Sequence, residues 1–203
     1  MSENKLNLMD ILRPEPNLDQ QGDAVDSMLK EHEKINEMGD MVRERCLDIM
    51  HGEDVDEAFL RNFIRFARDY ADHLHHGKEE KILFPTMTEE LGLVVEPLIN
   101  TGMMVDHDFG RYHIAELETA LNNYLESGED MDRLEILTHA CGWADLLARH
   151  TNKENMVVYQ FARRALARET MDEIYRKCRE FDDDPKEAAL REEMLELMED
   201  MRR

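Results

Sequence analysis

Apolar side chains recur at intervals of three and four residues along most of the chain, which predicts amphipathic helices. Glycine, proline and short polar clusters divide this pattern into long segments. The four longest predicted helices cover about residues 19–50, 55–83, 103–125 and 136–161. No window alternates between apolar and polar residues for long enough to suggest a strand. Long helices with short connections predict an all-α fold, an up-down antiparallel four-helix bundle.

An additional C-terminal helical segment follows the predicted bundle. Asp184 and Pro185 mark a helix start, because an acceptor side chain precedes a proline in the first turn. An apolar stripe then follows at Leu190, Met194, Leu197, Met198 and Met201. The expected division is an N-terminal extension at 1–18, the bundle at 19–168 and a helical extension at 169–203. The extension either folds back on the bundle, which we favour, or pairs with a second copy to form a homodimer.

The charge balance restricts the partners. With a net charge of −22, the chain would be repelled by nucleic acid phosphates and by anionic lipid, so we expect neither nucleic acid nor membrane as a partner. The longest apolar runs are far shorter than the ~20 residues of a membrane span, and the first residues do not resemble a signal peptide. Cys46, Cys141 and Cys178 form no CxxC pair, which is typical of free thiols. These features predict a cytoplasmic protein.

Four of the nine histidines fall into an internal repeat. His32 and His107 each lie between two acidic residues, and they are 75 residues apart. His75 and His150 each begin the pattern His-x-x-Lys-Glu, and they are also 75 residues apart. In both halves the lone histidine precedes the His-x-x-Lys-Glu pattern by 43 residues. The repeat predicts two similar helical hairpins that face each other.

The repeated residues have the chemistry of a metal site. Positions i and i+4 share one face of a helix, so each histidine and glutamate of the repeated pattern can point at the same place. Four imidazoles and two carboxylates are the ligand mixture of non-haem di-iron sites in helix bundles, although manganese or zinc could replace the two iron ions. Six ligands across two ions leave positions for water, O2, NO or peroxide. The predicted metal ligands are His32, His75, Glu79, His107, His150 and Glu154.

The alternative to a metal site is a set of unrelated histidines. A single histidine on an apolar stripe is usually a structural residue, and His139 is interpreted in this way. A single His-x-x-x-Glu pair also means little in a chain this acidic. The metal site is favoured because matched pairs and matched single histidines recur on four separate helices.

The register of the second helix leaves an alternative open. Regular helical geometry places His75 and Glu79 well away from the apolar stripe of that helix. The helix therefore either buries a wide arc or shifts phase near Gly77. His76 and Glu80 form a competing pair one residue out of register, whereas the repeat favours His75 and Glu79.

Four sequence blocks resemble the hemerythrin-like, HHE cation-binding family. They are LKEHEKI at 29–35, HHGKEEKILFP at 75–85, DHDFGR at 106–111 and RHTNKENMVVY at 149–159. The family's ligands fall on the same six residues that the repeat indicates. The resemblance implies an oxo- or hydroxo-bridged di-iron centre in an up-down bundle that reacts with O2 or NO.

One departure from the family changes the expected function. The classical oxygen carriers of the family have a His-x-x-x-His pair on the third helix, but here Arg111 stands four residues after His107. The fifth imidazole is therefore absent, or it is replaced by water or by His76. The site resembles more closely that of bacterial proteins which repair iron centres after nitrosative stress.

Three functions are compatible with these features. The first is a di-iron protein that binds or reduces O2, NO or peroxide in stress defence or sensing, with an electron donor that the sequence does not identify. The second is a non-catalytic iron-binding or iron-donor protein. The third is a metal-stabilised helical module that interacts through its C-terminal stripe. Whether the protein is an enzyme stays open between them.

Overall fold

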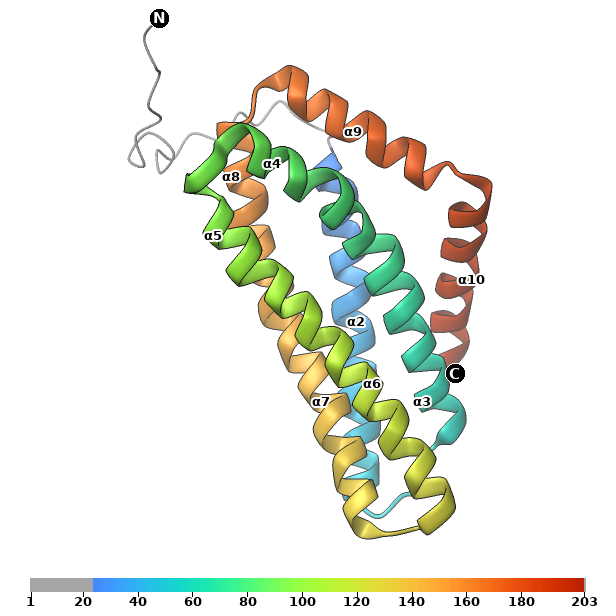
Figure 1. Cartoon of the computed structure of the whole chain (residues 1–203). Coiled ribbons are helices and arrows are strands. Elements are labelled where there is room, and N and C mark those ends of the chain that lie inside the picture. The colour runs from blue at the N-terminus through green and yellow to red at the C-terminus, as the bar shows by residue number, and fades with distance from the viewer. Residues whose placement is uncertain (1–23, 203) are drawn as a thin grey trace, which may run out of the picture.

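The computed structural model describes residues 24–202, and all regular structure in that range is helical, which confirms the all-α fold. Four long helical arms form an up-down bundle (Figure 1). The first arm is α2 (Ala24–Met50), and the second joins α3 (Glu57–Phe66), η1 (Ala67–His76), η2 (Glu79–Leu83) and α4 (Phe84–Leu91). After η3 (Gly92–Val94), the third arm joins α5 (Glu96–Leu98), η4 (Ile99–Met103) and α6 (Met104–Ser127). The fourth joins α7 (Asp130–Lys153), η5 (Glu154–Val158) and α8 (Tyr159–Ala165).

The second arm departs from the predicted helix in two ways. Its predicted end at about residue 83 is wrong, because the helix continues to Leu91. Pro85 lies in the first turn of α4, directly after a π-helical segment, where a missing N–H is tolerated. The segments η1 and η2 are π-helical, and their wider turns shift the phase of the arm. As a result all six residues at 74–79 are buried, so the arm both shifts phase and buries a wide arc near Gly77.

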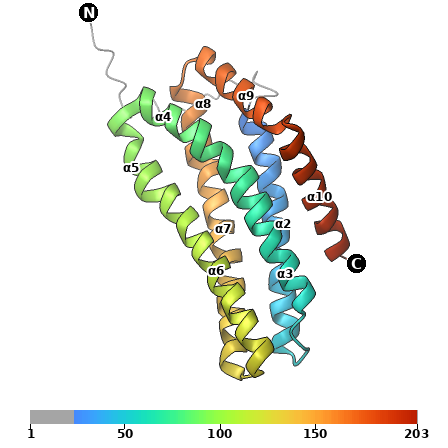
Figure 2. The ribbon, with the colours of Figure 1, turned by 45° about the vertical axis from the view of Figure 1, so that its right-hand side comes forward.

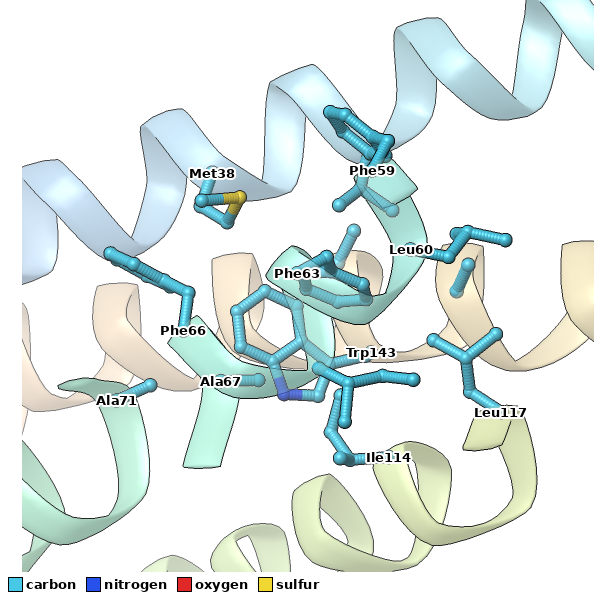
Figure 3. Packing of buried hydrophobic residues seen from close by; sticks show 14 of the residues in the cluster. Met38, Phe59, Leu60, Phe63, Phe66, Ala67, Ala71, Ile114, Leu117 and Trp143 are labelled. Carbon is cyan, nitrogen blue, oxygen red and sulfur yellow. The ribbon is translucent and has the colours of Figure 1, made fainter. Parts of the chain in front are cut away.

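The core consists of two apolar clusters at successive levels of the bundle. One cluster includes Phe63 and Trp143, whose rings meet nearly edge to face with centroids 5.0 Å apart (Figure 3). The other lies at the end of the bundle formed by α4, α5 and α8, and it includes Phe84 and Tyr159. On α2 the change from one cluster to the other occurs around His32. Buried polar side chains therefore occupy a layer between two apolar clusters.

The C-terminal extension folds back on the bundle. It consists of α9 (Arg168–Asp182) and α10 (Pro185–Met201), and the Asp184 carboxylate accepts the Lys186 N–H at 2.9 Å, as the predicted helix start requires. Helix α9 packs on α2, and α10 lies alongside α3 and η1 (Figures 1 and 2). Met194 and Met198 of α10 are buried in the cluster that contains Phe63.

Two predictions remain, one on the N-terminal extension and one on membrane-spanning helices. The predicted N-terminal extension at 1–18 lies outside the described residues. Among the helices that the structure describes, none combines the length and the apolar character needed to cross a membrane.

Candidate metal centre

The structure brings the six predicted ligands together in the polar layer between the two apolar clusters. They come from all four arms, and each is at most 1% exposed. Their nitrogen and oxygen atoms fall into two groups that share Glu79. One group is His32, His75, Glu79 and Glu154, and the other is His76, Glu79, His107 and His150. The second group contains a fifth imidazole, from His76, beside the six predicted residues.

All five imidazoles have the same orientation. In each ring Nδ1 points outward to an oxygen atom, and Nε2 is left facing the centre. The acceptors are Asn155 for His32 (2.6 Å), Glu31 for His75 (2.8 Å), Asp72 for His76 (3.3 Å), Glu80 for His107 (2.7 Å) and Asp106 for His150 (3.4 Å). Because carboxylate and amide oxygens accept hydrogen bonds, Nδ1 carries the proton and Nε2 presents a lone pair. Metal-bound histidines usually have this arrangement.

Several inward-facing atoms either crowd one another or lack a hydrogen-bond partner among the described residues. Nε2 of His32 and Nε2 of His75 lie 2.8 Å apart, and the corresponding atoms of His107 and His150 lie 3.1 Å apart. Two lone pairs at this distance repel each other unless a cation lies near both. In addition, four buried atoms make no hydrogen bond among the described residues: His76 Nε2, Glu79 Oε2, Glu154 Oε1 and Glu154 Oε2. Buried polar atoms are rarely left unpaired, so the donor set fits bound cations.

Burial keeps two of the imidazoles in the cluster neutral. Burial, with help from neighbouring imidazoles, lowers the pKa of both His75 and His76 well below the ordinary 6.5, so these rings stay neutral as ligands must be. Burial and the adjacent Glu154 charge raise the pKa of Glu79. Burial acts in the same direction on Glu154, but His150 and other imidazoles outweigh it and lower the pKa of Glu154.

In the absence of metal, His107 is the imidazole that attracts a proton. Burial opposes its charged form, but the carboxylates of Glu154 and Glu80 outweigh burial and raise the pKa of His107 to about 10. The centre therefore favours positive charge, and a metal ion would compete with this proton.

The repeated acidic and lysine residues form the outer supports of the centre. Glu31, next to His32, accepts the Nδ1 proton of His75 rather than contacting its own neighbour. Lys78, three residues after His75, donates to the same Glu31 carboxylate. The equivalent parts of the second half are Asp106, His150 and Lys153. The repeated pattern thus encodes a histidine, its acceptor and the cation behind that acceptor. The sequence displayed these residues without revealing which histidine each acid serves.

The repeat also includes two aromatic rings. Tyr159 stacks on His32 with ring centroids 5.4 Å apart, and Phe84 stacks on His107 at 5.9 Å. These aromatic residues are again 75 positions apart. Only Tyr159 carries a hydroxyl group, which donates to Glu79 Oε1 at 2.6 Å. The two halves therefore share a shape but differ in their hydrogen bonds.

Arg111, which replaces the second histidine of the classical third-helix pair, lies outside the cluster. Its guanidinium donates to Asp72 at 2.9 Å and to Glu80 at 2.6 Å. These are the carboxylates that accept from His76 and His107, whose rings stack with centroids 3.7 Å apart. Arg111 therefore braces two outer acceptors, while His76 supplies the fifth imidazole from a different arm.

Two other candidates from the sequence lie away from the centre. Glu80 faces His107 Nδ1 and Arg111 rather than the inward-facing nitrogens. His139 is buried in a separate place, where its Nδ1 lies 3.1 Å from Nδ1 of His113.

The sequence signal for His76 was its position beside His75, but a regular helix would point adjacent side chains about 100° apart.

A small cavity reaches the centre between the second and third arms. Its volume is about 140 Å³, and it borders His76 and His107. The remaining lining is mostly small or apolar, with Ala67, Ala71, Gly110, Ile114 and Trp143, and it is flanked by Arg68, Asp72 and Arg111. Space of this size admits a molecule of a few atoms.

Comparison with known protein families shows to which family the chain belongs. The model of the hemerythrin HHE cation-binding domain matches residues 23–162. The chain belongs to the hemerythrin family. The hemerythrin match includes all six predicted ligands and ends before α9 and α10. An HHE domain implies a metal-binding site, and the buried histidine and glutamate cluster is the place in this chain that fits it. Among curated proteins and among solved structures, the comparisons find no match.

Proposed function

We propose that this hemerythrin-family chain is a cytoplasmic non-haem di-iron protein that binds or reacts with O2, NO or peroxide, in stress defence or sensing. One observation carries the proposal. Five imidazoles present Nε2 to a buried space that also contains two carboxylates, and four of the buried atoms there have no hydrogen-bond partner among the described residues. Histidine and carboxylate mixtures of this kind suit iron in helix bundles, with manganese or zinc as substitutes.

The two groups of side chains suggest how the ions are shared. One ion would be held by His32 and His75, and the other by His76, His107 and His150. The carboxylates of Glu79 and Glu154 lie between the groups and are available to both ions. Bound iron would supply a redox-active centre with coordination positions for a small ligand.

The surrounding residues favour a small ligand. The outer acceptors hold each imidazole in one orientation, and the apolar clusters on either side exclude bulk water from the ligands. The cavity of about 140 Å³ beside His76 and His107 offers a path for a molecule the size of O2, NO or peroxide. At this size the cavity is smaller than the ~300–1,000 Å³ pockets that hold larger ligands.

The test combines metal analysis with optical spectroscopy. Protein purified aerobically should contain two iron ions per chain and absorb in the near ultraviolet, and stopped-flow mixing with O2, NO or peroxide should change that spectrum. His32→Gln should lower the iron content, whereas His139→Gln, which changes a buried histidine outside the cluster, should not. A colourless, zinc-containing protein with no response to these ligands would overturn the proposal.

A further inference from the structure

The most deeply buried cation in the described part of the chain is Lys78. Its side chain is 0% exposed, and its ammonium group donates to Glu31 and, at 2.9 Å, to Asp182. A buried ammonium needs paired carboxylates to offset its loss of hydration. Lys78 is therefore held in place by one carboxylate from α2 and one from the end of α9.

Glu31 connects this cation to the metal centre. One oxygen of its carboxylate accepts from Lys78, and the other accepts the Nδ1 proton of His75 at 2.8 Å. Nε2 of His75 faces the cluster. A continuous polar chain thus runs from Asp182 through Lys78 and Glu31 to a predicted metal ligand.

The outer end of this chain belongs to the C-terminal extension. Asp182 ends α9 and also accepts from Arg191 of α10. Both residues lie beyond the stretch that matches the hemerythrin domain. The other half of the repeat has no equivalent within the described residues, because Lys153 pairs with Asp106 and is 48% exposed. The extension therefore makes a difference between the two half-sites, the group with His32 and His75 and the group with His107 and His150, which are otherwise similar.

We propose that Asp182 is a positioning residue for His75, through which the C-terminal extension sets how firmly the His32 and His75 half holds its metal. An ammonium shared between two carboxylates neutralises each of them only in part. Glu31 then keeps enough negative charge to hold the Nδ1 proton of His75 firmly and to make Nε2 a better donor. This inference rests on the metal-binding function proposed above.

The matched variants are Asp182→Asn and Glu187→Gln. Glu187 also belongs to the extension and pairs with His73 of η1 at 2.8 Å, but His73 is not part of the cluster. In metal-free protein, the Nδ1 proton of His75 is followed by NMR and assigned by its loss in His75→Gln. Asp182→Asn should move this resonance upfield, Asp182→Glu should restore it in part, and Glu187→Gln should leave it in place.

Iron-loaded protein provides the second measurement. Release of reduced iron to a chelator should occur in two phases in the wild type. Asp182→Asn should accelerate only one phase, by about 3- to 10-fold, less than the ~10–100-fold expected for direct loss of an outer partner in Glu31→Gln. The phase affected should be the same in both variants.

Two results would overturn the inference. One is an unchanged His75 resonance and unchanged release in Asp182→Asn, and the other is the same change in Glu187→Gln, which would indicate general loosening of the extension. A wild-type protein that takes up no iron would overturn the proposed function instead. The metal-free resonance would still decide the role of Asp182.

Discussion

The hydroxyl of Tyr159 donates a 2.6 Å hydrogen bond to Oε1 of Glu79 in a fully buried setting. With Oε1 held by this bond, Oε2 of Glu79 faces the imidazoles, where it has no hydrogen-bond partner among the described residues. Phe84 stacks on His107 in the other half and has no hydroxyl group, and neither oxygen of Glu154 accepts a hydrogen bond from the described residues. The two carboxylates between the half-sites are therefore not equivalent.

Tyr159→Phe should destabilise the metal-free protein by about 1–3 kcal/mol, because Glu79 Oε1 would lose its donor while staying buried. Urea denaturation measures this free energy of unfolding. Tyr70→Phe is the matched control, since Tyr70 is buried against Phe66 and its hydroxyl makes no hydrogen bond with the described residues. Equal losses in the two variants would show that the bond to Glu79 contributes nothing specific.

Glu79→Ala and Glu154→Ala should each lower the metal content below two ions per chain, because each removes a carboxylate that lies between the half-sites. Glu80→Ala should keep two ions, since Glu80 supports His107 from outside together with Arg111. Elemental analysis of purified protein checks the content. Loss of metal in Glu80→Ala alone would mean that the register of the second arm is wrong.

His76→Gln should weaken the binding of one of the two ions, because it removes the third imidazole of the group that contains His107 and His150. His139→Gln should bind metal as the wild type does, since its ring contacts His113 outside the cluster. Competition with a chromophoric chelator measures both affinities. Two unchanged affinities in His76→Gln would exclude this ring from metal binding.

Cys141 should react with iodoacetamide at neutral pH, because a hydrogen bond from the Cys46 thiol, aided by the charge of Arg43, lowers the pKa of Cys141 to about 6. The reactive thiolate predominates above this pKa, so the alkylation rate should fall as the pH drops through 6. Burial raises the pKa of Cys178 to about 12, and this residue should stay unmodified. Mass spectrometry after timed alkylation identifies the modified cysteine.

Cys46→Ala provides the control for the thiol prediction. Without the Cys46 donor, the alkylation profile of Cys141 should move toward the ordinary thiol value of 9.0. A profile unchanged by the substitution would contradict the hydrogen bond between these two cysteines.

Met194→Ala should cost about 2–5 kcal/mol of stability, because it opens a cavity where α10 packs into the core. Met131→Ala, at a side chain that is 66% exposed, should change stability very little. Urea denaturation compares the two variants. A small loss at Met194 would indicate that α10 contributes little to the folded bundle.

Local spacing determined much of this protein. Helical periodicity predicted the four arms, and Asp184 with Pro185 predicted the start of α10. The interval of 75 residues predicted the two similar half-sites, because ligands at i and i+4 must share a helix face wherever the helix lies. The structure brings all six predicted residues together.

Tertiary structure decided which side chains from different helices meet. The π-helical turns of η1 rotate His76 into the cluster. The apolar stripe indicated a change of phase or a wide buried arc near Gly77, but only the structure shows that both occur. The link from Glu31 to His75 joins residues 44 positions apart, and the contact of Lys78 with Asp182 joins residues 104 positions apart. Periodicity determines which face of a helix a side chain occupies, but the packing of whole helices determines what lies opposite that face.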